Sequence, residues 1–149
     1  RRIGWGHRVV CGSPSYLEKA GMLKVPADLA DHNCLTFRSH PGSNLWSFRG
    51  PKGTSKVRVS GGLFADNGEA LCAAAVAGLG LILVPNWLVG IEIRQGRLRQ
   101  VLGKFQVVPE ASPLYAVYPH QRHLPPKVRA FVDFLVERFA TETEWDGSH

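Results

Sequence analysis

Residues Phe64–Pro85 read FADNGEALCAAAVAGLGLILVP and contain the signals for a helix followed directly by a buried strand. Asp66 or Asn67 can cap the helix, and Glu69 stands three residues after Asp66, as in a capping box. Gly78 stands where helices often end in the left-handed conformation. The small apolar residues between these signals predict a helix packed closely on most of its faces, and the last five residues predict a strand buried on both sides. The unit indicates an α/β fold.

The start of this helix is also a candidate anion site. Unpaired backbone N–H groups and the positive end of the helix dipole suit a carboxylate or a phosphate. Asp66, Asn67 and Gly68 would then face the ligand. The alternative is a cap that stabilises the helix and binds nothing.

The composition is that of an ordinary globular protein. Its 149 residues are 44% hydrophobic and 20% charged, which is enough for one core or two small lobes. No apolar run approaches the ~20 residues that a membrane-spanning helix needs, and no signal-peptide core follows Arg1–Gly4. We therefore expect a cytoplasmic protein that is neither secreted nor embedded in a membrane. The net charge of +6 comes from scattered Lys and Arg residues and is only a weak indication of nucleic-acid binding.

The three cysteines, Cys11, Cys34 and Cys72, are widely spaced and lie among apolar residues. Zinc sites and dithiol redox motifs need close cysteine pairs, which are absent from the sequence. We expect buried, reduced thiols, which fits the cytoplasm.

Catalytic patterns are also absent from the sequence. It contains no G-x-S-x-G elbow, no H-E-x-x-H and no P-loop, and its six histidines are dispersed. His120 and His123 are spaced by three residues but have no carboxylate or cysteine beside them, so a surface pair is favoured over a metal site. The sequence therefore predicts no enzymatic activity, no metal and no cofactor.

The remaining elements follow from turn signals and hydrophobic periodicity. Ser13 caps a helix whose first position is Pro14, and Asn86 caps a later helix. We expect strands at residues 7–11, 34–37, 45–48, 56–60, 97–102 and 114–118, helices at 14–20, 68–77, 86–95 and from 123 onward, and a loop at 103–113.

Five segments of the sequence stand in a recognisable order and spacing: SPSYLEKAG, PADLADHNCLTF, DNGEALCAAAVAGLGLILVPNWLV, GRLRQVL and LYAVYPHQRHLPPKVRAFVDFL. Taken together they resemble the effector-binding domain of LysR-type transcriptional regulators. The resemblance covers Arg8 to Phe139, and it depends on the set of segments rather than on one motif.

The resemblance implies an α/β fold of the periplasmic-binding-protein-like (type II) class, with two lobes joined by crossover strands and an effector between them. The strand-helix units that open the first lobe do not appear before Arg8, so the first lobe would be partial and would expose apolar surface. The implied division is a remnant of the first lobe and a crossover strand at 1–12, the complete second lobe at 13–84, the return crossover and the rest of the first lobe at 85–140, and a polar tail at 141–149 compatible with a tag remnant.

The resemblance also implies which residues hold the effector. Arg38 would pair with a carboxylate, and Ser39 and His40 would donate hydrogen bonds. The alternative for Arg38 is a solvated surface charge. The full set of implied ligand-binding residues is Ser13, Pro14, Phe37, Arg38, Ser39, His40, Asp66, Asn67, Gly68, Val84 and Pro85.

The implied function is that of a ligand-sensing domain in a transcription regulator. The effector would be a small carboxylate or aromatic metabolite, and the protein would form a homodimer or homotetramer. DNA would be bound only through an N-terminal winged helix-turn-helix that this chain does not contain. A solute-binding protein for transport is the alternative, but it would need export and an oxidising compartment, which the unpaired cysteines disfavour. A peroxide sensor would need a reactive cysteine pair, which the cysteine spacing also disfavours.

Overall fold

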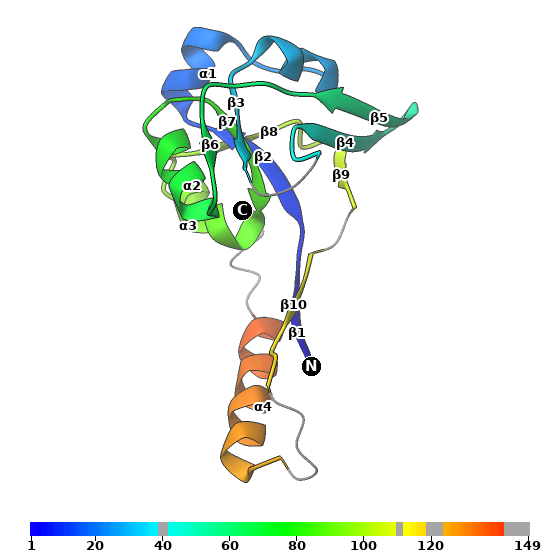
Figure 1. Ribbon diagram of the computed structural model, residues 1–149, viewed down its shortest axis with the longest axis vertical. Helices are drawn as coiled ribbons and strands as arrows, with labels where there is room; N and C mark the ends of the chain where they lie inside the picture. The colour runs from blue at the N-terminus through cyan, green and yellow to red at the C-terminus, as the bar shows by residue number, and fades with distance from the viewer. Residues whose placement is uncertain (39–41, 110–111, 119–123, 142–149) are drawn as a thin grey trace.

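The structure is a computed structural model that describes residues 1–38, 42–109, 112–118 and 124–141. Figure 1 shows an upper α/β body from which a lower body of β1, β10 and α4 extends. The helices are α1 (Pro14–Ala20), the 3-10 helix η1 (Pro26–Asp31), α2 (Gly68–Val76), α3 (Asn86–Arg94) and α4 (Pro126–Thr141). The strands are β1 (Arg2–Gly6), β2 (Arg8–Gly12), β3 (Cys34–Phe37), β4 (Leu45–Gly50), β5 (Gly53–Arg58), β6 (Phe64–Ala65), β7 (Leu81–Pro85), β8 (Arg99–Val101), β9 (Gln106–Val108) and β10 (Ser112–Tyr115).

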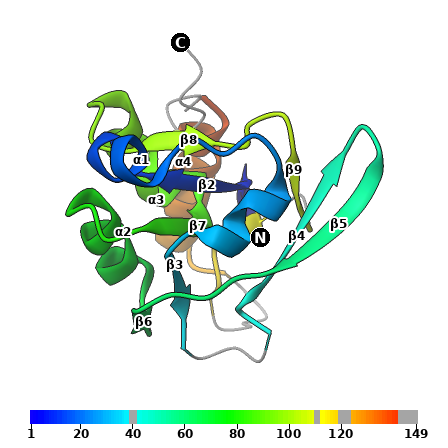
Figure 2. The ribbon, with the colours of Figure 1, turned by 90° about the horizontal axis from the view of Figure 1, so that it is seen from above.

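The upper body is organised around a five-stranded sheet with the order β6-β3-β7-β2-β8, which Figure 2 shows from above. Strand β3 runs parallel to both β6 and β7, whereas β2 runs antiparallel to β7 and β8. Alternate residues of the strands enter two different cores. Val10 and Leu83 pack with α1, η1 and the second sheet, whereas Val9 and Val84 pack with α2 and α3. The sheet is therefore covered on both faces.

A second sheet with the order β5-β4-β9 stands beside the first. Its β4–β5 hairpin confirms the predicted hairpin, and its inner face buries Trp46 and Phe48. We predicted a loop where β9 lies, and that prediction was wrong. The three residues of β9 pair with β4, which is distant in sequence, and a strand this short has no periodicity of its own.

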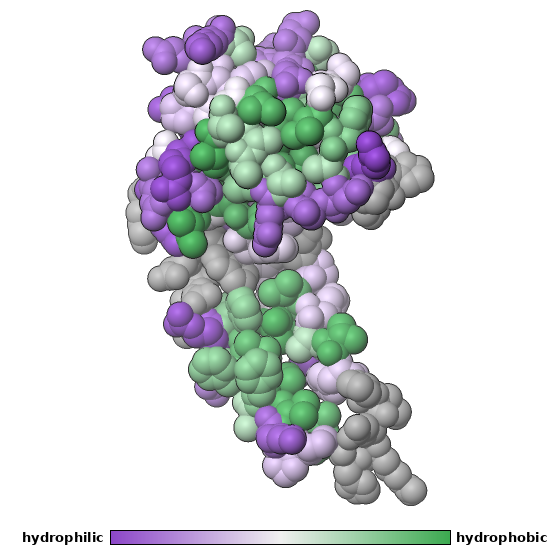
Figure 3. Space-filling view, turned by 60° about the vertical axis from the view of Figure 1, so that its left-hand side comes forward, coloured by the Kyte–Doolittle hydropathy of each residue, from purple (hydrophilic) through white to green (hydrophobic). Residues whose placement is uncertain are grey.

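The lower body consists of β1 paired antiparallel with β10, with α4 packed against β1. Many of its apolar side chains are exposed, and Figure 3 shows them gathered on one face. The exposed large apolar side chains of this body, with the residues that follow β10, are Trp5, Tyr115, Val117, Tyr118, Phe131 and Phe134. The segment 99–108, which we expected in the first lobe, pairs instead with strands of the upper body. None of the helices in the described residues is long and apolar enough to cross a membrane.

The unit at Phe64–Pro85 contains the predicted helix and strand, with two corrections. Asn67 is the N-cap, and its side-chain oxygen accepts the backbone N–H of Ala70 at 2.7 Å. Glu69 is therefore the second helical residue and not the third, so the predicted capping box does not form. Helix α2 buries only one stripe, which includes Leu71, because its alanines are small enough to tolerate exposure on the other faces. Gly78 follows the helix with a φ of 86°, as predicted.

We predicted that Asn86 caps α3, and that prediction was wrong. Asn86 lies inside the first turn, where it is buried, and Pro85 occupies the N-cap position. The side-chain oxygen of Asn86 accepts the backbone N–H of His7 at 3.1 Å, and the backbone N–H of Asn86 donates to the carbonyl of His7 at 2.8 Å. The asparagine thus ties β7 to the start of β2, at the place where both leave the sheet.

Candidate functional site

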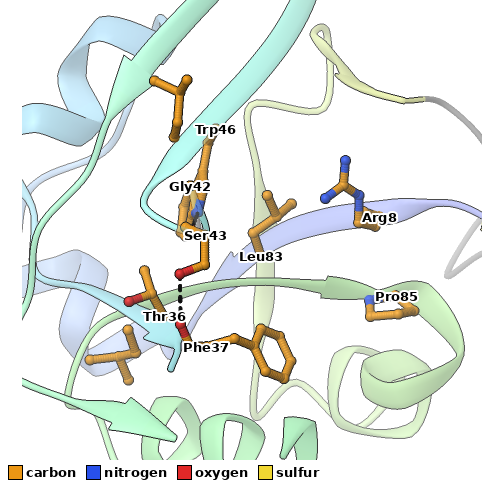
Figure 4. Close-up of a pocket in the computed structure, with 10 residues that line it drawn as sticks. Arg8, Thr36, Phe37, Gly42, Ser43, Trp46, Leu83 and Pro85 are labelled. Carbon is orange, nitrogen blue, oxygen red and sulfur yellow. Dashed lines mark hydrogen bonds between the residues drawn. The ribbon is translucent and has the colours of Figure 1, made fainter. Parts of the chain in front are cut away.

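A cavity of about 390 Å³ opens between the central sheet and β4, at the end of the sheet that faces the lower body. We call it the main cavity. Figure 4 shows it with its lining side chains. It is lined by Arg8, Leu35, Thr36, Phe37, Gly42, Ser43, Leu45, Trp46, Leu83 and Pro85.

The walls of the main cavity are apolar and are fixed in place. The indole N–H of Trp46 donates to the backbone carbonyl of Ser43 at 3.1 Å. The hydroxyl of Ser43 in turn donates to the carbonyl of Phe37 at 2.6 Å, the bond drawn in Figure 4. Leu83 and Pro85, two residues apart on β7, line the same cavity. These walls suit a flat or bulky apolar group.

Thr36 contributes the most unusual polar atom of the main cavity. Its side chain is only 3% exposed, and its hydroxyl oxygen is buried without a hydrogen-bond partner among the described residues. Leaving such a group unsatisfied costs about 1–3 kcal/mol. Thr36 also lines the cavity, and a polar ligand atom that reached this hydroxyl would remove the cost.

Arg8 supplies the positive charge of the main cavity. Its guanidinium is partly buried on β2, and this burial lowers the pKa of the side chain from its usual range. One guanidinium N–H donates to the carbonyl of Val108 at 2.9 Å. No carboxylate of the described residues forms an ion pair with Arg8. Its other N–H groups have no partner among the described residues, and a guanidinium can bind an anion in bidentate fashion.

Of the expected ligand-binding residues, Phe37 and Pro85 line the main cavity. Val84 is 0% exposed and packs in the core beneath α2 and α3, because neighbouring residues of a strand point to opposite faces. Arg38 is exposed beyond the end of β3, and its backbone N–H donates to the backbone carbonyl of Ala65 at 3.0 Å. Ser39 and His40 lie outside the described residues.

The other expected residues do not line the main cavity. Ser13 is buried and caps α1, since its hydroxyl accepts the N–H of Tyr16 at 3.1 Å, and Pro14 takes the first helical position as predicted. At the start of α2, Asp66 and Asn67 are exposed. Gly68 lies close to the cavity wall, because a Cβ there would be 3.7 Å from the ring of Phe37.

The sequence analysis missed the other lining residues of the main cavity, which are Arg8, Leu35, Thr36, Gly42, Ser43, Leu45, Trp46 and Leu83. For Arg8 and Leu83, the signal in the sequence was the alternation of side chains along β2 and β7. Arg8 pairs with Pro85, and Val10 pairs with Leu83, so these residues share one face of the sheet. Trp46 comes from a hairpin whose position beside this sheet depends on tertiary packing.

The cysteines fit the expectation of free thiols. Cys11 and Cys34 are buried, and burial raises the pKa of each thiol to about 12. Cys72 is partly exposed, and its pKa is also raised, mainly by burial. Among the described residues, no group of three His, Cys, Asp or Glu side chains converges in a way that could hold a metal ion.

Residues 1–140 match the family described as the LysR substrate binding domain. The chain belongs to this family. The match confirms the resemblance drawn from the five sequence segments, and it identifies the fold as periplasmic-binding-protein-like. The LysR substrate binding domain is a regulatory module of transcription regulators and not an enzyme family.

The relatives of this LysR domain are transcription regulators rather than transport proteins. The chain is 34% identical over 140 residues to the HTH-type transcriptional activator AaeR of Escherichia coli K12, covering 93% of this chain and 44% of AaeR. It is 34% identical over 129 residues to the regulator CrgA of Neisseria meningitidis, covering 86% of this chain and 42% of CrgA. The chain thus spans less than half the length of these curated relatives. The alternative of a transport protein is not supported.

Two solved LysR structures have the same fold. The regulatory domain of CrgA from Neisseria meningitidis superposes with a TM-score of 0.82 at 30% identity, over 93% of this chain and 67% of that domain. The full-length virulence activator AphB of Vibrio cholerae superposes with a TM-score of 0.78 at 27% identity, over 93% of this chain and 47% of AphB.

Proposed function

We propose that this LysR domain senses a small aromatic or otherwise apolar carboxylate bound in the main cavity. The observation that carries the proposal is a pair of polar groups in an otherwise apolar cavity: Arg8, which has no carboxylate partner among the described residues, and the buried Thr36 hydroxyl, which has no hydrogen-bond partner among them. The carboxylate would accept hydrogen bonds from the free N–H groups of Arg8 and from the hydroxyl of Thr36. The apolar body would pack between Phe37, Trp46 and Leu83. The cavity volume lies within the ~300–1,000 Å³ range of small-molecule sites.

Residues outside the main cavity complete the proposal. Arg38, which follows Phe37 directly, and the backbone N–H groups of Asn67 and Gly68 at the start of α2 would form an outer rim that attracts the anion. Their role is secondary to that of Arg8, because both are exposed to solvent, where charges are screened.

The ligand would act by biasing the arrangement of the two bodies. Arg8 and Pro85 line the cavity, and Arg8 lies where β1 of the lower body leads into β2 and donates to the carbonyl of Val108, the last residue of β9 before the chain passes to β10. A ligand that contacts both residues can bind one arrangement of the bodies more tightly than another, and only such a difference shifts the equilibrium. In the whole regulator this change would alter a homodimer or homotetramer in the cytoplasm, with DNA bound through an N-terminal winged helix-turn-helix. The domain itself would catalyse no reaction.

The test compares benzoate with benzamide, which has the same ring but no charge. We expect benzoate to raise the melting temperature of the protein and to bind measurably by calorimetry, and benzamide to have little effect. Arg8→Gln should abolish the preference for benzoate. Equal binding of the two compounds, or a preference that survives in Arg8→Gln, would contradict the proposed recognition of a carboxylate.

A further inference from the structure

A second cavity of about 400 Å³ shares Arg8 with the main cavity but is built from different elements. It lies between the start of β2, the end of β8 and the segment that leads into β9. We call it the second cavity. Its lining residues are His7, Arg8, Gln100, Gly103, Lys104, Phe105, Gln106 and Val107.

The second cavity has a different chemistry from the main cavity. Besides Phe105 and Val107, its side chains are polar or cationic, and it contains two permanent cations, Arg8 and Lys104. Residues 93–109, which contribute most of the lining, contain no Asp or Glu. In the part of the chain that the structure describes, neither cation forms an ion pair with a carboxylate.

Two like charges that line one cavity repel each other unless an anion lies between them. The repulsion matters more here because Arg8 is partly desolvated, which already lowers its pKa. Its bond to Val108 uses only one of the five N–H donors of the guanidinium. Lys104 adds an ammonium group, and the amides of Gln100 and Gln106 add further N–H donors.

We propose that the second cavity binds a small oxyanion of the phosphate type. A tetrahedral oxyanion offers several acceptor oxygens, which suits a site that has many donors and, among its described lining residues, no carboxylate. The geometry also makes the two cavities interdependent. Because one guanidinium lines both, an oxyanion in the second cavity would engage N–H groups that the carboxylate in the main cavity also needs. This coupling rests on the proposed function, whereas oxyanion binding itself does not.

The test is a phosphate titration of the purified protein, read as melting temperature, with sodium chloride of equal ionic strength as the reference. We expect inorganic phosphate to raise the melting temperature above the chloride reference. Lys104→Met removes a charge from the second cavity only, and Lys52→Met, in the exposed β4–β5 turn, is the matched control. Loss of a charge-assisted hydrogen bond should raise the Kd for phosphate about tenfold in Lys104→Met and leave Lys52→Met unchanged.

Two outcomes would overturn the oxyanion site: phosphate that acts no more strongly than chloride, or a Lys104→Met variant that responds like the unmodified protein. The coupling is tested by measuring benzoate affinity with and without saturating phosphate. Weaker benzoate binding in phosphate, but not in chloride, supports the shared use of Arg8, and unchanged binding refutes it. If benzoate binds while phosphate does not, this inference fails and the proposed function stands. If phosphate binds while benzoate does not, the proposed function fails and the oxyanion site stands.

Discussion

Thr36→Val is the sharpest test of the main cavity, because we expect it to change stability and ligand affinity in opposite directions. Valine keeps the β-branched shape of threonine on β3 and replaces the hydroxyl, which is buried and has no partner among the described residues, with a methyl group. Without ligand, removing an unsatisfied buried hydroxyl should stabilise the fold by about 1 kcal/mol. With a carboxylate bound, the variant lacks a hydrogen bond to a charged acceptor, worth about 1.5 kcal/mol, so the Kd should rise about tenfold.

Urea denaturation without ligand measures the first effect, and titration calorimetry with benzoate measures the second. Thr54→Val is the matched control, because Thr54 is exposed on β5, where the same substitution should change stability by less than about 0.5 kcal/mol. A Thr36→Val variant that is less stable than the unmodified protein would show that the hydroxyl already has a partner. An unchanged Kd for benzoate would show that the hydroxyl does not contact the ligand.

Three further predictions concern stability. Tyr16→Phe should cost about 1–3 kcal/mol in urea denaturation, because the Tyr16 hydroxyl lies 2.9 Å from Nδ1 of the buried His32, which would lose its partner. Asn67→Ala should cost about 1 kcal/mol through loss of the α2 cap, and a cost below about 0.3 kcal/mol would contradict the capping role. Burial raises the pKa of Cys11 and Cys34 from 9.0 to about 12, so the unfolded chain loses these two protons at a lower pH than the folded chain does. Stability should therefore fall as the pH rises from about 9 to about 12, and should fall less in Cys34→Ala.

The sequence was sufficient to predict those elements whose structure is specified by residues close to them in the chain. Ser13 and Pro14 specify the start of α1, Gly78 specifies the end of α2, and the β4–β5 hairpin follows from two alternating runs joined by a turn. In each case a cap, a positive φ or a turn acts within a few residues of the side chain that specifies it.

The sequence was insufficient where a partner is distant. Strand β1 pairs with β10 at the other end of the chain, and β9 pairs with β4, so neither short strand could be found from its own residues. The main cavity has the same origin, because Arg8, Thr36 and Trp46 come from three separate strands. An unsatisfied hydroxyl such as that of Thr36 leaves no trace in sequence, since it is defined by the absence of a neighbour.

The reciprocal hydrogen bonds between His7 and Asn86 fix the point from which the lower body extends. His7 lies between β1 of the lower body and β2, whereas Asn86 is the first residue of α3, which packs in the upper body. At this end β2 therefore cannot slide along β7 without breaking both bonds. Because α4 packs against β1 and extends away from this junction, a small change in the direction of β1 there would give a much larger displacement at the far end of α4. A ligand in contact with Arg8 and Pro85 would lie beside this anchored point.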